Sequence, residues 1–231
     1  MEQTRKSDWG VILCTLDEES GVRPTIEELN RSLRNPYILV VDGWSHDKTV
    51  EIAKNLGADI LFQEGKGKGN AIRQGIQQLG SVFRYVIFTD ADYTYPAEYI
   101  PKMIEMLESN PDIGMVIGNR FSKEFSFKDA SNSAFYAGNR LLAFAQHVVN
   151  GIKLTDPLSG LRVVRCEILK DWKPKSEGFD VEAEMNYRVE RSRYKTTEIP
   201  IQYRPRLGEK KLKLKHGFTI LKRIVSESVV Q

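Results

Sequence analysis

Two aspartates at the end of the most apolar segment are the residues best suited to bind a cation. Asp90 and Asp92 close the segment YVIFTDAD and are separated only by Ala91. Neighbouring carboxylates repel each other unless a cation lies among them. Hard carboxylate oxygens suit a divalent cation, which usually takes water and phosphate oxygens as its other ligands. The pattern therefore predicts a metal site and a substrate that carries a diphosphate.

Further acids follow other apolar segments. Asp17 and Glu18 come after the first such segment, and Asp42 ends the second. One interpretation is that these carboxylates join Asp90 and Asp92 at one edge of a sheet. The alternative is that single acids cap the helices that follow, which we favour for Asp47.

A glycine-rich basic stretch, GKGKGNAIRQG (65–75), has the composition of a phosphate-binding loop. It lacks the spacing of the P-loop and of the dinucleotide-binding fingerprint. We interpret it as a basic loop at a helix start, where Lys66 and Lys68 could approach a phosphate with help from the helix dipole.

The elements that must position these residues alternate along the first half of the chain. Apolar runs predict strands at 9–13, 37–42, 58–63, 85–90 and 113–118, and the intervening segments predict helices at 24–33, 47–55, 69–79 and 96–109. The first of these helices would begin at Pro24. Strands that are apolar on both faces are typical of a parallel sheet covered by helices on both sides, with ligands at the carboxyl ends of the strands. The predicted fold class is therefore α/β.

Composition and charge exclude several classes. The chain has 231 residues, of which 41% are hydrophobic, and 34 Lys and Arg against 31 Asp and Glu give a net charge of +3. A disordered chain and a dedicated nucleic-acid-binding protein are both excluded. Two cysteines, with no signal peptide and no long apolar run, predict reduced thiols and a location on the cytosolic side. If a membrane is involved, we expect the protein to lie on its surface.

Eight motifs occur in an order that belongs to a known family. They are TLDEES (15–20), VVDGWSHDKT (40–49), GKGNAIRQG (67–75), DADYTYP (90–96), GNRF (118–121), DPLSGLR (156–162), EGFDVEAEM (177–185) and EIPIQYRPRLGEKKL (198–212). With these motifs the chain resembles the family 2 glycosyltransferases and, more narrowly, the polyprenyl-phosphate (dolichol-phosphate) hexose synthases. The resemblance implies a Rossmann-like, mostly parallel GT-A fold. It also implies inverting transfer of a hexose from a nucleotide sugar to dolichyl or polyprenyl phosphate.

The resemblance assigns donor contacts to the strand ends. It implies that the nucleoside is bound by Thr15, Asp17, Glu18 and Asp42, that Lys66 and Ala91 complete the donor site, and that Asp90 and Asp92 bind Mg²⁺ or Mn²⁺. Gly43 stands where relatives often carry a second Asp. The nucleobase therefore stays open, with GDP-mannose and UDP-glucose as the leading donors.

Cations are expected around the acceptor. A phosphate monoester is largely ionised near pH 7 and needs no strong base, whereas bringing it close to a diphosphate requires fixed positive charge. By resemblance, the acceptor phosphate would contact Arg120, Arg162, Arg206 and Lys211, with Arg120, Arg206 and Asp156 as the catalytic residues. Asp156 would orient the phosphate or act as a base, or else it only forms a turn before Pro157.

Three further interpretations concern residues near these motifs. Lys128 could replace an arginine that relatives carry near the position of Ser131. Glu182 and Glu184, spaced by two on a predicted helix, cannot share one face and are not expected to be a metal pair. We expect one of them to face the site and the other to face solvent or pair with a base.

The C-terminal segment has a character of its own. We predict a single catalytic domain over 1–205 and a basic amphipathic segment over 206–231, whose apolar residues recur at helical spacing from Phe218. This helix lies on a membrane surface, packs on the catalytic domain, or does both.

Two rival functions stay open: a family 2 transferase with a soluble or glycan acceptor, and a sugar-nucleotide-binding protein without turnover. A sugar-1-phosphate nucleotidyltransferase is disfavoured because the segment after the first strand is acidic. Oligomeric state has no signal in the sequence.

Overall fold

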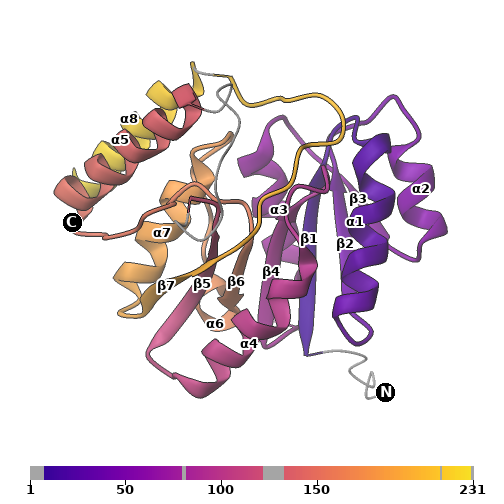
Figure 1. Cartoon of the computed structure of the whole chain (residues 1–231), viewed down its shortest axis with the longest axis horizontal. Coiled ribbons are helices and arrows are strands. Elements are labelled where there is room, and N and C mark those ends of the chain that lie inside the picture. The colour runs from indigo at the N-terminus through magenta and orange to yellow at the C-terminus, as the bar shows by residue number, and fades with distance from the viewer. Residues whose placement is uncertain (1–7, 80–81, 122–132, 214, 230–231) are drawn as a thin grey trace.

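The computed structural model describes residues 8–79, 82–121, 133–213 and 215–229. They fold into a twisted sheet with helices on both faces (Figure 1). The strands are β1 Trp9–Thr15, β2 Tyr37–Asp42, β3 Asp59–Phe62, β4 Tyr85–Asp90, β5 Ile113–Asn119, β6 Arg162–Arg165 and β7 Lys195–Pro200. The helices are α1 Glu19–Ser32, α2 Thr49–Asn55, α3 Lys68–Leu79, η1 Ala97–Tyr99, α4 Ile100–Ser109, α5 Ser133–Asn150, α6 Cys166–Leu169, α7 Val181–Arg191 and α8 His216–Val229.

The sheet is mostly parallel, which confirms the predicted fold class. Its order is β3-β2-β1-β4-β6-β5-β7. β1 pairs in parallel with both β2 and β4, whereas β6 runs antiparallel between β4 and β5. The carboxyl ends of β1, β2 and β4 therefore meet at one edge of the sheet, as the sequence pattern predicts.

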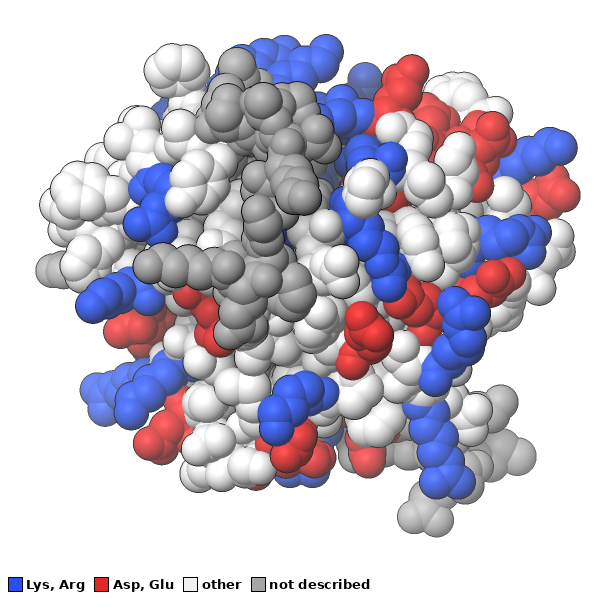
Figure 2. Space-filling model, in the orientation of Figure 1, with Lys and Arg blue, Asp and Glu red and all other residues white. Residues whose placement is uncertain are grey.

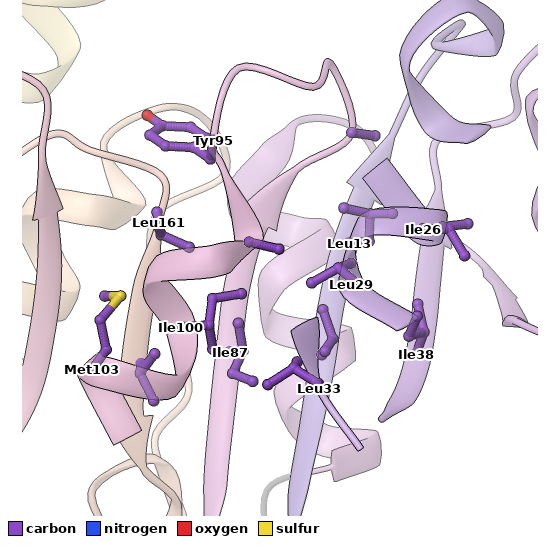
Figure 3. Close-up of a cluster of buried hydrophobic side chains, with 14 of the residues drawn as sticks. Leu13, Ile26, Leu29, Leu33, Ile38, Ile87, Tyr95, Ile100, Met103 and Leu161 are labelled. Atoms are coloured by element: carbon purple, nitrogen blue, oxygen red, sulfur yellow. The ribbon is translucent and has the colours of Figure 1, made fainter. Parts of the chain in front are cut away.

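Apolar side chains pack on both faces of the sheet. Alternate residues of β1 point to opposite sides, so that Leu13 joins the cluster under α1 and α4 while Ile12 joins the cluster under α3 and α7. Figure 3 shows the first cluster, with Ile26 and Leu29 from α1 and Ile100 from α4 packed over the strands. This packing on two faces explains why the central strands read as continuous apolar runs.

Helix α1 begins five residues earlier than the sequence predicts, so the expected start at Pro24 is wrong. The N–H groups of Glu18 and Glu19 donate to Thr49 Oγ1 at 2.8 Å and Asp47 Oδ2 at 3.0 Å, which fixes the start of the helix. Pro24 lies in the second turn, where it lacks only its own N–H. The carbonyl that would accept this bond belongs to Ser20, which is exposed to water.

The C-terminal helix packs on the domain. α8 lies beside α5 and also contacts α7, with Ile220 and Ile224 buried between them (Figure 1). Packing on the domain, one of the two arrangements expected for this helix, is therefore confirmed. The predicted boundary at residue 206 lies in the segment that joins β7 to α8, and it stays a prediction. In the described part of the chain, every helix is too short or too polar to span a bilayer.

Candidate active site

A cavity of about 610 Å³ opens at the carboxyl ends of β1 and β4. Its walls also come from the start of α3, from α5 and from the segment between β7 and α8. One end is lined by charged groups, among them Glu18, Asp90, Asp92, Arg120 and Arg206. Of the strand-end acids that the sequence singles out, Glu18, Asp90 and Asp92 therefore meet at one cavity.

Asp90 is held at the end of β4 by a buried lysine. Its Oδ1 accepts from Lys68 Nζ at 2.7 Å, and the same ammonium lies 2.7 Å from Glu182 Oε1. Burial alone would raise the pKa of Asp90, but the charge of Lys68 outweighs it and keeps this pKa below its ordinary value. Lys68 thus balances two carboxylates, and because it also lines the cavity, its approach to a phosphate stays a prediction. Lys66 lines the cavity as expected.

Asp92 is 2% exposed, and its two oxygens have different partners. Oδ1 accepts from the N–H and the hydroxyl of Thr94 at 3.1 and 2.6 Å. Oδ2 lies 2.7 Å from Arg206 Nη1. Burial and the neighbouring charge of Asp90 raise the pKa of Asp92. The two acids of the Asp-Ala-Asp motif therefore sit in different electrostatic surroundings.

Glu18 closes the charged end of the cavity. It is 6% exposed and forms ion pairs with Arg206 and, at 2.8 Å, with Lys211 Nζ. Its Oε2 atom is buried without a hydrogen-bond partner among the described residues. Burial raises the pKa of Glu18, although both cations oppose this shift.

The carboxylate oxygens at the charged end of the cavity are suitable ligands for a divalent cation. Asp90 and Asp92 supply hard oxygens, and Glu18 adds a buried carboxylate oxygen without a partner. The described residues contain no cluster of three or more His, Cys, Asp or Glu side chains that could enclose an ion. The two aspartates would therefore hold the ion together with phosphate oxygens and water.

Gly160 leaves the space that Asp90 needs. A Cβ atom at this position would lie 2.7 Å from Asp90 Oδ2, and Lys68 restrains the carboxylate from turning away. Gly160→Ala is expected to weaken Mn²⁺ binding, measured by electron paramagnetic resonance, by about tenfold or more. Gly178→Ala is the matched control, because its Cβ would make only an ordinary contact at 3.5 Å. Equal affinities in the two variants would show that Asp90 does not need this space.

Arg120 and Asp156 form a bidentate ion pair beside the cavity. Arg120 Nε and Nη2 lie 2.8 and 2.7 Å from the two Asp156 oxygens. The backbone N–H of Asp156 in turn donates to Glu198 Oε1 at 2.7 Å. Arg120 lines the cavity and lies over the ring of Tyr203, whereas Asp156 is fully buried behind it. Asp156 thus orients Arg120, and the structure gives no support to its direct contact with the acceptor.

Arg162 does not reach the cavity, contrary to the sequence-based expectation. Its side chain is 1% exposed and donates to Asn186 Oδ1 at 2.6 Å and to the carbonyls of Pro157 and Ser159 at 2.6 and 2.8 Å. These bonds occupy the guanidinium inside the domain. Arg162 therefore braces the loop that carries Asp156 and cannot bind an acceptor phosphate.

The donor residues expected from the sequence fall into two groups. Thr15, Glu18, Lys66 and Ala91 line the cavity. Asp42 is fully buried and accepts from Thr15 Oγ1 at 2.7 Å and from the hydroxyl and N–H of Ser45 at 2.6 and 2.8 Å. Asp17 accepts from the His46 N–H at 2.7 Å. Neither aspartate lines the cavity; both order the loops around it.

The two glutamates of α7 have different surroundings, as expected: one faces the site and the other does not. Glu182 lines the cavity beside Lys68, while Glu184 accepts from the backbone N–H groups of Lys175 and Ser176 and lies 3.8 Å from Arg223. Lys128 lies outside the described residues.

Sequence reasoning missed the apolar end of the cavity. Its walls include Phe121, Phe135, Tyr136, Leu142, Leu158, Phe179, Leu212 and Ile220. Two of these rings adjoin the charged end, since Arg120 lies over Phe121 and Lys210 over Phe135. Most of these residues come from α5, α8 and the loops next to them. The amphipathic spacing in these helices was a usable signal, but it does not tell which apolar residues face a cavity and which face the core.

Cys14 at the end of β1 is predicted to be a poor nucleophile. Burial, reinforced by the charges of Asp90 and Glu182, raises the pKa of its thiol to about 12. At pH 8 the thiol is therefore protonated, and alkylation by iodoacetamide in the folded protein is expected to be at least about tenfold slower than in urea. Mass spectrometry of the modified peptide measures both rates. Equal rates would mean that the thiolate forms readily in the folded state.

A mostly parallel sheet with an Asp-Ala-Asp motif at the end of β4, beside a cavity with a charged end, defines the nucleotide-diphospho-sugar transferase fold of the GT-A type. The sequence profile described as Glycosyl transferase family 2 matches residues 10–173. The chain belongs to this family and is a glycosyltransferase.

Three named relatives show which members of the family this chain is similar to. The chain is 33% identical over 208 residues to the dolichyl-phosphate hexose transferase of Haloferax volcanii, covering 89% of this chain and 86% of that protein. It is 36% identical over 197 residues to glycosyltransferase AglJ of the same organism, covering 84% and 63% of the two chains. It is 31% identical over 229 residues to the dolichol-phosphate mannosyltransferase of Pyrococcus furiosus, covering 93% and 62%. The chain thus spans less than two thirds of the last two proteins.

Solved structures share the fold at low sequence identity. Glucosyl-3-phosphoglycerate synthase from Mycobacterium tuberculosis, in complex with Mg²⁺ and uridine diphosphate, matches with a TM-score of 0.77 at 19% identity, over 96% of this chain and 80% of that one. The same enzyme with Mn²⁺, uridine diphosphate and phosphoglyceric acid matches with a TM-score of 0.75 at 18% identity, over 96% and 79%. These matches support the GT-A fold.

Proposed function

We propose that this enzyme transfers a hexose from a nucleotide sugar, GDP-mannose or UDP-glucose, to dolichyl or another polyprenyl phosphate. The transfer inverts the anomeric centre and uses Mg²⁺ or Mn²⁺. The observation that carries the proposal is the division of one cavity into a charged end and an apolar end. A diphosphate with its cation suits the first end, and the first units of an isoprenoid chain suit the second.

The apolar end favours a lipid acceptor over a soluble one. Aromatic and aliphatic side chains from α5, α8 and the adjoining loops line it, as described above. A sugar or a small phosphorylated acid would leave these side chains without an apolar partner, whereas an isoprenoid chain would bury them. The relatives named for dolichyl-phosphate transfer agree with this acceptor class.

The chain's own residues fit the steps of such a transfer. The acceptor phosphate attacks the anomeric carbon, the bond to the diphosphate oxygen breaks, and the nucleoside diphosphate leaves. Arg120, fixed by Asp156, and Arg206, with Lys211 nearby, supply positive charge for the two anionic groups. A divalent ion held by Asp90 and Asp92 would stabilise the negative charge that develops on the leaving diphosphate.

We further propose that the enzyme lies on the cytosolic face of a membrane through α5 and α8. Large apolar side chains are exposed on these helices: Tyr136, Leu141, Phe144 and Val148 on α5, and Phe218, Leu221 and Val225 on α8. Figure 2 shows this part of the surface, at the upper left, as largely uncharged with lysines and arginines scattered over it. Apolar side chains with basic neighbours suit the interface of an anionic membrane.

Charged substitutions on this face are expected to release the enzyme from vesicles. Phe144→Asp combined with Phe218→Asp should lower partitioning onto phosphatidylglycerol-containing vesicles by about tenfold or more, because two exposed phenylalanines no longer enter the interface. Flotation of the vesicles measures the bound fraction. Val82→Asp is the control, since Val82 is also an exposed apolar residue but lies just before the amino end of β4 and not on α5 or α8. Equal partitioning of all three proteins would remove the proposed membrane contact.

A transfer assay tests the function itself. Labelled GDP-mannose and UDP-glucose are supplied separately with a short polyprenyl phosphate and Mn²⁺ or Mg²⁺. We expect metal-dependent lipid-linked sugar from one donor. Metal-dependent release of free sugar without a lipid product would contradict the lipid acceptor and leave a soluble acceptor as the better proposal. Binding of donor with neither transfer nor hydrolysis would contradict turnover.

A further inference from the structure

A short basic strap crosses the charged end of the cavity. We define the strap as residues 204–213, between β7 and α8, which passes over the carboxyl ends of β4 and β1 (Figure 1). At its start, the N–H groups of Arg204 and Leu207 donate to the carbonyls of Thr94 and Asp92 at 3.0 and 3.1 Å. Arg204 also forms a bidentate ion pair with Glu28 at 2.7 and 2.8 Å.

On both sides of Leu207, side-chain ion pairs attach the strap to the site. Arg206 contacts Glu18 and Asp92, and Lys211 Nζ contacts Glu18 at 2.8 Å and the Asp17 carbonyl at 3.0 Å. Among the described residues, no backbone hydrogen bond joins 208–212 to the rest of the domain. Residues 208–212 are therefore held by side-chain contacts, namely the ion pair of Lys211 with Glu18 and the contact of Lys210 Nζ with the Phe135 ring, 3.2 Å from its centre.

Arg206 and a metal ion would compete for one oxygen atom. Asp92 Oδ1 already accepts two bonds from Thr94, so Oδ2 is the oxygen that Asp92 can offer to an ion. This Oδ2 is the atom that lies 2.7 Å from Arg206 Nη1. A guanidinium and a divalent ion on the same carboxylate oxygen repel each other strongly in a buried site. Asp90 presents no such conflict, because its cation, Lys68, contacts Oδ1, and Oδ2 faces the space beside Gly160.

The pairing of Arg206 also leaves hydrogen-bonding capacity unused. Arg206 Nε and Glu18 Oε2 are both buried without a hydrogen-bond partner among the described residues. Unsatisfied buried polar atoms are costly, so this arrangement is less stable than a fully bonded one. A phosphate would offer the guanidinium several acceptor oxygens in the fork geometry that arginine prefers.

We propose that Arg206 binds two partners in turn: Asp92 while the site is empty of diphosphate, and a substrate phosphate once the diphosphate and its metal ion have entered. Arg206 thereby lowers the affinity for the metal alone and couples metal binding to diphosphate binding. The inference rests on the proposed function for the presence of a diphosphate and a metal at this site. It assigns Arg206 a positioning role that is additional to its contact with phosphate.

The test measures Mn²⁺ affinity in the absence of any nucleotide, by the electron paramagnetic resonance signal of the free ion. Arg206→Ala is expected to bind Mn²⁺ about tenfold more tightly than the unaltered protein, because Asp92 no longer carries a competing cation. Arg206→Lys, which keeps the charge, should stay close to the unaltered protein. GDP or UDP should raise the Mn²⁺ affinity of the unaltered protein more than that of Arg206→Ala.

Arg204→Ala is the matched control. Arg204 lies two residues from Arg206 on the same strap but pairs with Glu28, away from Asp92. If loosening of the strap alone raised the affinity, both variants would show the rise, and the inference would be wrong. Unchanged or weaker Mn²⁺ binding by Arg206→Ala would also overturn it. If the unaltered protein bound no Mn²⁺ even with GDP or UDP, both the inference and the metal site of the proposed function would be wrong. If the Mn²⁺ affinities were as expected but the unaltered protein transferred no sugar to a polyprenyl phosphate, only the proposed function would be wrong.

Discussion

Asp92→Ala is expected to lower the rate of sugar transfer by at least about a thousandfold, because the charge on the leaving diphosphate is then no longer neutralised. Asp92 is buried at the charged end of the cavity, and its Oδ2 is the oxygen it can offer to a cation. The substitution also removes the partner that orients Arg206. The initial rate of formation of lipid-linked sugar, with saturating donor and Mn²⁺, measures the loss.

Asp112→Ala is the control for this experiment. Asp112 is exposed just before β5, at the edge of the sheet opposite to the carboxyl end of β4, and its replacement should leave the rate unchanged. Far-ultraviolet circular dichroism shows whether both variants are folded. A rate for Asp92→Ala within about tenfold of the unaltered enzyme would contradict a metal role for this carboxylate.

Asp156→Ala is expected to have the largest effect on stability. Removing the carboxylate leaves the largely buried Arg120 guanidinium, 16% exposed at the cavity, without its partner; a fully buried charge would cost about 3–5 kcal/mol, and the loss here should approach the lower end of that range. Asp156 is fully buried, and it also accepts from the Arg120 N–H at 3.0 Å, so the loss includes a backbone contact. The free energy of unfolding in urea, monitored by tryptophan fluorescence, measures the change.

The double variant Arg120→Met/Asp156→Leu tests whether the unpaired charge of Arg120 causes the loss of stability. Replacing both charges leaves no buried ion without a partner, so the double variant should be more stable than Asp156→Ala alone. Both proteins should lose sugar transfer, one because Arg120 is absent and the other because Arg120 is no longer oriented. If the double variant were the less stable of the two, burial of an unpaired charge would not be the cause of the loss.

The parallel half of the fold could be predicted because its signals are local. The strand ends at Thr15, Asp42 and Asp90 follow uninterrupted apolar runs, and parallel pairing brings these ends together. The meeting of Glu18, Asp90 and Asp92 at one cavity follows from the same pattern. The catalytic and binding roles of these residues stay predictions.

Other features depend on contacts that the local sequence does not encode. The motif that contains Arg162 does not show that its side chain points inward, because Asn186, one of its partners, comes from α7. Lys68 lies in a glycine-rich basic stretch whose composition resembles that of a phosphate-binding loop. Its ion-pair partners, however, are Asp90 of β4 and Glu182 of α7, which are distant in the sequence. The start of α1 is set by the Asp47 and Thr49 side chains across the sheet edge, so Pro24 was a misleading signal.

The insertion of β6 has a consequence for how the chain reaches its folded state. β4, which carries Asp90, gains its second neighbour from residues 162–165, long after β1, β2 and β3 have left the ribosome. Until then β4 is an edge strand with an apolar sequence, and such edges pair readily with other chains. A nascent or truncated chain that stops before Arg162 would therefore expose β4, which ends in the Asp-Ala-Asp motif, to aggregation. The order in which the sheet is synthesised makes the half that contains β1 to β4 dependent on β6, which is synthesised later.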